Sequence, residues 1–304
     1  VDGKQAFYAM IRPLVVALFQ SDEGVAYVMQ RLGLPPQALT ELIAMLETQA
    51  NLLQQHQLPI PFQHDVALNY TATHFTVKGA KSIGLALKGT RPGHPYADVV
   101  FMFAFSKVLS VIQASLDRAN LRVEIPHDPS SPQIRYESSC QLPIAAFFDD
   151  FVVQVMTDSP EGLVPATRTA LHAIAAAFAQ HGMQVNDAPG KTEIMLQFEG
   201  QGAAAARLAF QASNTIHASS PLFPQLNVKS ATHYRHLGSI NNGPNCKGMD
   251  VSSRIAQAAQ AHKDLSAKIC SNPKIPLKSR MLFWKALVLS RLLYHSSLWH
   301  TFNS

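Results

Sequence analysis

The chain has 304 residues, of which 47% are apolar, and carries a formal net charge of +5. That length and apolar content suffice for a buried core and exclude a disordered chain. No charged n-region with a cleavage site opens the sequence, and the long apolar stretches, such as Asp98 to Ser110, are short or interrupted, so we predict neither export nor a membrane span. Three cysteines without CxxC spacing favour a reducing, intracellular compartment, either nucleus or cytoplasm, over a zinc site or disulfide framework.

The first half of the chain is predicted to begin with two helices, over 6–19 and 35–55, where apolar residues recur at helical spacing. An alternating stretch rich in Thr, Tyr, Phe and Val predicts a strand at 66–77. A cluster of Gly and Pro at 89–95 then leads into a long apolar helix at 97–116. Because the sequence starts with Val rather than Met, we expect it to be part of a longer polypeptide.

The second half is predicted to continue with a helix at 164–181, which ends at a glycine. An alanine run followed by Ser and Pro at 200–226 favours an irregular insertion. A short strand is predicted at 234–240. From Met249 onward the pattern is typical of two helices joined by a proline-containing turn at 272–276.

Two adjacent aspartates, Asp149 and Asp150, stand between apolar and aromatic residues near the middle of the chain. Apolar runs on both sides of a polar pair predict strand, tight turn and strand, which would present both carboxylates at a hairpin tip. Two neighbouring carboxylates repel each other, and a divalent cation is the commonest partner that stabilises them. From these residues alone, a plain surface turn is the alternative, because Asp is a favoured turn residue.

The positive charge is concentrated in the last 54 residues. This segment has a net charge of +7, which leaves −2 for the first 250 residues. A basic helical segment beside a slightly acidic body favours a polyanionic partner, most simply nucleic acid. A solvated helix face is the alternative. The segment contains one acid, Asp264, and eight basic residues: Arg254, Lys263, Lys268, Lys274, Lys278, Arg280, Lys285 and Arg291.

Five short motifs occur in a fixed order along the chain. They are Val1-Asp2-Gly3-Lys4-Gln5-Ala6-Phe7-Tyr8, Gly89-Thr90-Arg91-Pro92-Gly93-His94-Pro95-Tyr96-Ala97-Asp98-Val99-Val100-Phe101, the Asp149-Asp150 hairpin, Gly182 to Asn186 with Lys191-Thr192-Glu193, and Tyr234-Arg235-His236-Leu237-Gly238. Taken in this order and spacing, the set resembles the reverse transcriptase family, most closely the type carried by non-LTR (LINE-like) retrotransposons. The resemblance extends from Asp2 to about Trp299.

The resemblance implies an α+β fold of the right-hand polymerase type. Residues 1–248 would form the palm, an antiparallel sheet packed on helices, with residual fingers elements and insertions. Residues 249–304 would form a basic helical thumb, and Tyr234 to Gly238 a hairpin that holds the primer strand. In the family a fingers segment precedes the position of Asp2, so we expect additional domains in the full-length polypeptide. The implied partners are an RNA template, a DNA primer and dNTPs, without a membrane.

The implied activity is RNA-directed DNA polymerisation, in which a primer 3′-hydroxyl is joined to the α-phosphate of a nucleotide. Two metal ions stabilise the attacking and leaving oxygens in such a reaction. As the resemblance implies, Asp2 and Asp149 would be the main metal ligands, with Asp150 assisting. Oxygen ligands and phosphate suit two Mg²⁺ ions, with Mn²⁺ as the alternative. For Asp2 alone, a frayed terminal residue is the other interpretation.

Four further residues take their roles from the resemblance. Phe7 corresponds to a position that lies under the sugar and excludes a 2′-hydroxyl, and an ordinary core aromatic is its alternative. Arg91 and Gly93 would contact the nucleotide from the loop before the long helix, where glycine permits a close backbone approach. Lys191 matches a lysine near the leaving pyrophosphate that acts as general acid or charge stabiliser. A solvated lysine is its alternative.

Two positions depart from the family pattern. Pro92 replaces the usual Gln, which removes a contact to the nucleotide, and His94 replaces the usual Asp or Cys. A second hypothesis is therefore a degenerate, catalytically inactive retroelement fragment that binds nucleic acid. A third, from another class, is a phosphate-transferring hydrolase with a metal at Asp149 and Asp150, for which the sequence offers no clear set of further ligands.

Overall fold

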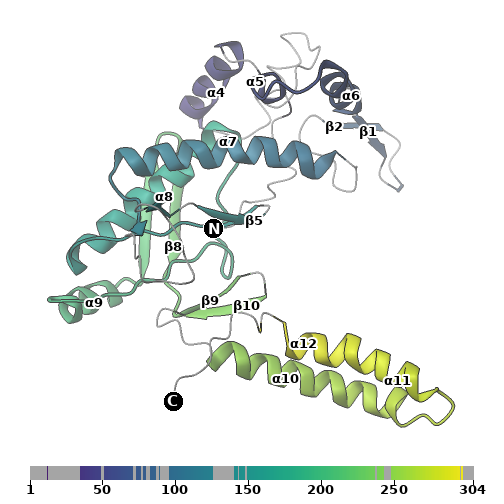
Figure 1. Cartoon of the computed structure of the whole chain (residues 1–304). Coiled ribbons are helices and arrows are strands. Elements are labelled where there is room, and N and C mark those ends of the chain that lie inside the picture. Colours follow the sequence, from purple (N-terminus) through teal and green to yellow (C-terminus); the bar gives the residue numbers. More distant parts are fainter. Residues whose placement is uncertain are drawn as a thin grey trace. The chain divides into compact units, whose positions relative to one another are not determined.

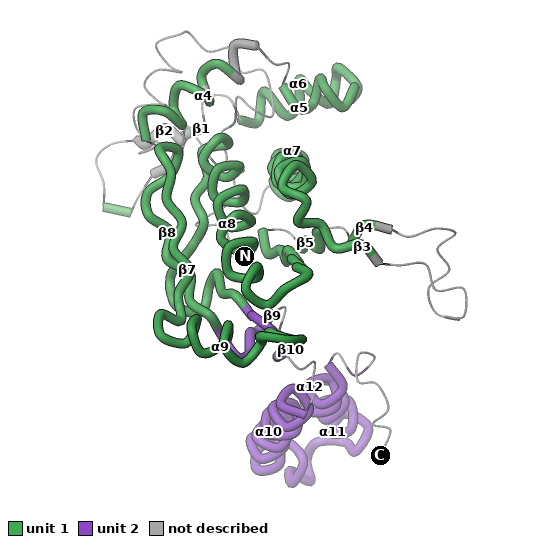
Figure 2. Tube along the Cα trace, turned by 90° about the vertical axis from the view of Figure 1, so that its left-hand side faces the viewer, with its two compact units in different colours: residues 1–194, 198–230 green, residues 195–197, 231–304 purple. Residues whose placement is uncertain are grey.

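The computed structural model describes residues 12, 35–48, 51–70, 73–76, 78–79, 83–86, 89, 96–125, 140–142, 144–147, 149–236, 238–242, 248–294 and 296. The chain divides into two compact units, which Figure 2 distinguishes by colour. Unit 1 comprises residues 1–194 and 198–230, and unit 2 comprises residues 195–197 and 231–304. The sequence predicted a division at 248–249 instead, because it assigned the hairpin that precedes the basic helices to the palm.

The core of unit 1 is built on two long helices, α7 (Ala97–Arg118) and α8 (Leu163–Gln180) (Figure 1). Both agree with the predicted helices to within two residues at each end. Apolar residues of α7 spaced by three or four positions share one core cluster with residues of α8, as an amphipathic helix requires. The buried members include Phe101, Phe105, Val108, Ile112 and Leu116 of α7, and Ala170, Ile174, Ala177 and Phe178 of α8.

Helix α7 corrects one sequence-based prediction. With 22 residues and a largely apolar composition, it is long and apolar enough to cross a membrane. The prediction that this stretch is too short for a span was therefore wrong on length. A core helix passes the same test, and here Phe101 and Phe105 are fully buried among the residues of unit 1.

The N-terminal part of unit 1 contains three described helices, α4 (Pro36–Thr48), α5 (Leu52–Gln55) and α6 (Ile60–Tyr70). The single helix predicted at 35–55 is thus divided, and α5 begins anew where the Asn51 side chain accepts a hydrogen bond from the Gln54 amide. The strand predicted at 66–77 is wrong in its first half, because residues 66–70 complete α6. Among the described residues of this stretch, β1 (Thr73–Thr76) is the strand, and it pairs with β2 (Ile83–Ala86).

All strand ladders in the described part of the chain are two-stranded and antiparallel. Besides β1 and β2, unit 1 contains β3 (Glu124–Ile125) with β4 (Cys140–Gln141), β5 (Ala145–Phe147) with β6 (Asp150–Val152), and β7 (Thr215–Ser220) with β8 (Phe223–Lys229). The fold is thus a mixture of helices and small antiparallel sheets. A continuous palm sheet stays a prediction.

The segment at 200–226 is regular, so the predicted irregular insertion was wrong. It forms α9 (Ala203–Gln211), strand β7 and the start of β8. Ile216, Ala218, Leu226 and Val228 are buried in alternation along this hairpin, and α8 contacts both of its strands (Figures 1 and 2). The β7–β8 hairpin therefore covers one side of α8.

Unit 2 consists of a β-hairpin and a helical hairpin. Strands β9 (His233–His236) and β10 (Ser239–Asn242) precede α10 (Gly248–Leu265), which continues into a π-helical turn at Ser266–Cys270. After a turn, α11 (Leu277–Trp284), a second π-helical stretch at Lys285–Leu289 and α12 (Ser290–Leu292) run back along α10 (Figure 1). Ala258, Ala261, Leu265 and Val288 form the core between them. The predicted helix, turn and helix are confirmed.

Candidate functional site

The two adjacent aspartates lie at the tip of the β5–β6 hairpin, as the sequence predicted. Phe147 pairs with Asp150 across the ladder, and Asp149 lies in the turn between the two strands. Asp149 therefore belongs to the turn and Asp150 is the first residue of β6. Both residues are partly exposed, so solvent reaches this end of the hairpin.

The hairpin is anchored to the core of unit 1 by the residue that follows the pair. Phe151 is fully buried, and its ring lies 5.7 Å from that of Phe105 on α7 and 5.9 Å from that of Phe178 on α8. Successive side chains of a strand point to opposite faces. With Phe151 directed into the core, Asp150 is directed toward the opposite, more exposed face of the hairpin, together with Phe147.

This arrangement fits a hard divalent cation in part. Two partly exposed carboxylates on consecutive residues supply oxygen ligands while leaving room for bound water, which Mg²⁺ retains. In the described part of the chain, no three His, Cys, Asp or Glu side chains gather into a metal-binding group. The third predicted ligand, Asp2, lies outside the described residues. The expected proximity of Asp2 and Asp149 therefore stays a prediction.

Lys191 is exposed on a compact loop after α8. The loop is closed by a hydrogen bond from the Thr192 amide to the Asn186 carbonyl (3.0 Å) and another from the Lys191 amide to the Ala188 carbonyl (3.0 Å). Met183, which precedes this loop, belongs to the same core cluster as the phenylalanine that anchors the aspartate hairpin. The loop and the hairpin thus start from one core.

The three predicted nucleotide-binding residues Phe7, Arg91 and Gly93 lie outside the described residues. Gly89, just before that loop, is described and buried. Its carbonyl accepts a hydrogen bond of 2.8 Å from Nε of Arg12, whose Nη1 also donates to the carbonyl of Tyr70 at 2.9 Å. The guanidinium carbon of Arg12 lies 5.2 Å from the centre of the Tyr70 ring.

Sequence reasoning did not identify Arg12. The side chain is only 2% exposed although it is charged, and its acceptors are 58 and 77 positions away along the chain. Neither spacing nor periodicity contains a signal for such a contact. The structure thus adds a buried cation that fixes the start of the predicted nucleotide loop to the end of α6.

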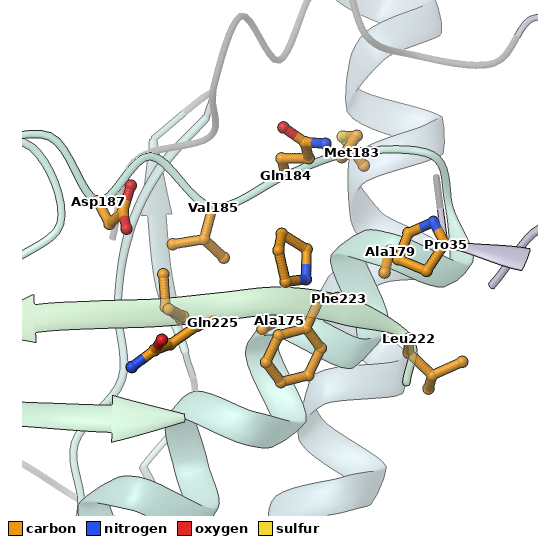
Figure 3. A pocket seen from close by; sticks show the side chains of 12 residues that line it. Pro35, Ala175, Ala179, Met183, Gln184, Val185, Asp187, Leu222, Phe223 and Gln225 are labelled. Carbon is orange, nitrogen blue, oxygen red and sulfur yellow. The ribbon is translucent and has the colours of Figure 1, made fainter. Parts of the chain in front are cut away.

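A cavity of about 130 Å³ lies elsewhere in unit 1 (Figure 3). Ala175 of α8, Val185 and Phe223 form apolar walls, while Gln184 and Asp187 add polar groups. Its volume is below the range of about 300–1,000 Å³ that is typical of small-molecule sites. Neither aspartate of the hairpin lines it, so it gives no support to a nucleotide pocket at the predicted site.

Unit 2 carries the predicted primer-holding hairpin and ten of the 25 Lys and Arg residues of the chain. Strands β9 and β10 pair in a regular register from His233 with Asn242 to His236 with Ser239. A hairpin at this place is therefore confirmed, and the strand predicted at 234–240 is in fact two. Among the described residues of the helical segment, six basic side chains are exposed: Lys263, Lys268, Lys274, Lys278, Lys285 and Arg291.

Comparisons with known proteins give no assignment: no family model, no curated protein and no solved structure matches the chain. The reverse transcriptase family suggested by the five motifs therefore stays a prediction.

Proposed function

We propose that the chain is the palm and thumb of an RNA-directed DNA polymerase, of the type carried by non-LTR retrotransposons. The proposal rests on one observation. Two consecutive carboxylates lie at the tip of a hairpin, and the residue that follows them, Phe151, packs against aromatic rings of both core helices. A surface turn needs no such anchor, whereas a metal-binding pair needs a fixed position. The motifs on both sides of the pair supply its context.

In this proposal Asp149 and Asp150 hold Mg²⁺, together with Asp2. Bound there, two ions would stabilise the attacking 3′-oxygen and the leaving phosphate oxygen. The exposed Lys191 would offset the charge of the leaving pyrophosphate. Phe7, Arg91 and Gly93 would orient the nucleotide, with RNA as template and DNA as primer.

The exposed basic side chains of unit 2 support binding to a nucleic acid duplex. If all six exposed cations of the helical segment contact phosphates, the logarithm of the affinity falls with the logarithm of salt concentration with a slope of about −5. Removal of one of them, in Lys278→Ala, then makes the slope less steep by about one unit. Filter binding of a labelled RNA–DNA duplex at several salt concentrations measures both values.

A degenerate fragment that binds nucleic acid without synthesis is the second candidate. The observation that favours it is Pro92, which stands where the family has a Gln that contacts the nucleotide. Both candidates retain the basic helical segment, so duplex binding does not distinguish them. Synthesis of DNA on the template does, because only the active polymerase extends the primer.

The decisive experiment is extension of a DNA primer on an RNA template with Mg²⁺. It is done with this chain and with the chain preceded by whatever residues come before Val1 in its natural reading frame. We expect extension in at least one of them, and its loss in Asp149→Ala. Asp158→Ala, which removes an exposed aspartate of the same segment, is the matched control and should extend normally.

Absence of extension by both wild-type proteins would contradict the polymerase proposal. Salt-sensitive duplex binding in the same proteins would then favour the inactive fragment. Extension that survives Asp149→Ala would refute the assignment of the aspartates.

A further inference from the structure

A buried charge cluster connects the two parts of unit 2. Asp250 lies in the first turn of α10 and is only 1% exposed. Its Oδ1 accepts a hydrogen bond of 3.1 Å from the backbone amide of Ile240 in β10. The same oxygen lies 3.6 Å from Nε of Arg254, one turn further along the helix. One carboxylate thus contacts both the hairpin and its own helix.

Arg254 reaches the turn of the same hairpin. It is 6% exposed, and its Nη2 donates a hydrogen bond to the carbonyl of Gly238, between β9 and β10. Its guanidinium carbon lies 4.5 Å from the centre of the Tyr294 ring, beyond the end of α12. The hairpin turn is therefore contacted on two sides, by the guanidinium of Arg254 from α10 and by the ring of Tyr294, which follows α12.

The turn residue leaves little room for a different arrangement. Gly238 has φ +84°, a conformation that glycine adopts readily. A Cβ placed on it would come within 3.3 Å of the Tyr294 ring and 3.7 Å of Nη2 of Arg254. Close packing of the ring, the guanidinium and the turn fixes the angle between the hairpin and α10.

A buried ion pair contributes little net stability to the fold, because the free-energy cost of removing two charges from water offsets their attraction. A two-stranded hairpin, for its part, is at best marginally stable alone. The cluster supplies what such a hairpin lacks, which is a defined orientation on a larger element. His233 and Arg235 of β9 are exposed and move with that orientation.

We propose that Asp250, Arg254 and Tyr294 are positioning residues, which hold the β9–β10 hairpin and α10 as one body so that the hairpin meets the primer strand in a fixed orientation. The inference rests on the proposed polymerase function, which it deepens by assigning a mechanical role to residues that do not touch the substrate. Substitutions that weaken these contacts would leave only a fraction of molecules with the hairpin correctly oriented. The apparent affinity for the primer–template falls in proportion to that fraction, whereas a saturating concentration of primer–template restores the rate of extension.

The test compares wild type with Arg254→Lys, which keeps the charge but loses the planar fork that spans the turn, the carboxylate and the ring. Ser252→Ala, an exposed change on the same turn of α10, is the matched control. In primer extension, we expect Arg254→Lys to raise KM for the primer–template about tenfold or more, the equivalent of one hydrogen bond to a charged group, with kcat within about twofold. Tyr294→Leu should act in the same direction, and Tyr294→Phe, which keeps the ring, should resemble wild type.

A second measurement is independent of synthesis. In the free protein, hydrogen exchange at the Ile240 amide should be faster in Asp250→Ala than in wild type, because the acceptor is gone. An unchanged KM in Arg254→Lys, or unchanged exchange in Asp250→Ala, overturns the positioning role even when wild type extends primers. If wild type binds the RNA–DNA duplex without extending it, the polymerase proposal fails alone, and about tenfold weaker duplex binding by Arg254→Lys supports the cluster. If wild type neither extends nor binds, both proposals fall.

Discussion

Replacement of Phe151 by alanine should separate the aspartate hairpin from the core of unit 1. The side chain is fully buried and packs against the rings of Phe105 and Phe178. Truncation of a buried Phe to Ala costs about 3–5 kcal/mol, which includes the cavity left behind. We expect a loss in that range, together with loss of primer extension, because the carboxylates no longer have a fixed position. Phe151→Leu should keep a folded protein with a smaller loss.

Urea unfolding followed by far-UV circular dichroism measures the effect. With an m-value of about 2–3 kcal/mol/M, the midpoint of unit 1 should fall by about 1–2.5 M. Both tryptophans, Trp284 and Trp299, belong to unit 2, so their fluorescence follows the unfolding of that unit. The fluorescence transition serves as an internal reference in the same sample.

Phe147→Ala is the matched control, because this ring belongs to the same hairpin but is 56% exposed. Its replacement should change stability by no more than about 0.5 kcal/mol. Equal losses for Phe147→Ala and Phe151→Ala would refute the reasoning, because the hairpin would then not be anchored through Phe151.

Two further predictions concern buried basic side chains of unit 1. Burial lowers the pKa of His181 below 6.5, so the folded state favours the neutral ring while the unfolded chain takes up a proton. Stability is therefore complete above about pH 6.5 and declines as the pH falls below it, by at most about 1.4 kcal/mol per pH unit; urea midpoints at pH 7.5 and 5.5 should show a smaller decline in His181→Gln. Arg12→Met should cost about 3–5 kcal/mol in the same assay, because the carbonyls of Tyr70 and Gly89 lose a buried charged donor. Arg12→Met with wild-type stability would show that this contact is dispensable, and equal pH profiles would show the same of the His181 ring.

The elements that could be predicted from sequence are those in which one pattern dominates. Helices α7 and α8 have long apolar periodicity, and the aspartate hairpin has apolar runs on both sides of its polar pair. The failure at 66–77 came from a short stretch in which alternation and helical spacing coincide, and burial of Val66, Ala67 and Tyr70 on one face of α6 decided for the helix.

The failure at 200–226 has a different cause. Ser and Pro were interpreted as breakers, yet Pro224 lies in a two-stranded ladder, where half of the amides need no partner. Within the candidate site, the aspartate pair was visible because its members are adjacent. Arg12 and the cluster of Asp250 and Arg254 could not be recognised in the sequence, because their contacts depend on acceptors that only folding brings close to them.

The division of the chain has a practical consequence for dissecting it. Because residues 195–197 belong to unit 2 while their neighbours belong to unit 1, the backbone passes from one unit to the other three times, after positions 194, 197 and 230. No single proteolytic cut can release unit 2 intact, because its residues 195–197 stay with the N-terminal fragment. A protein that begins at Ala231 would lack three residues of its own unit, and one that ends at Ser230 would carry them without their partners.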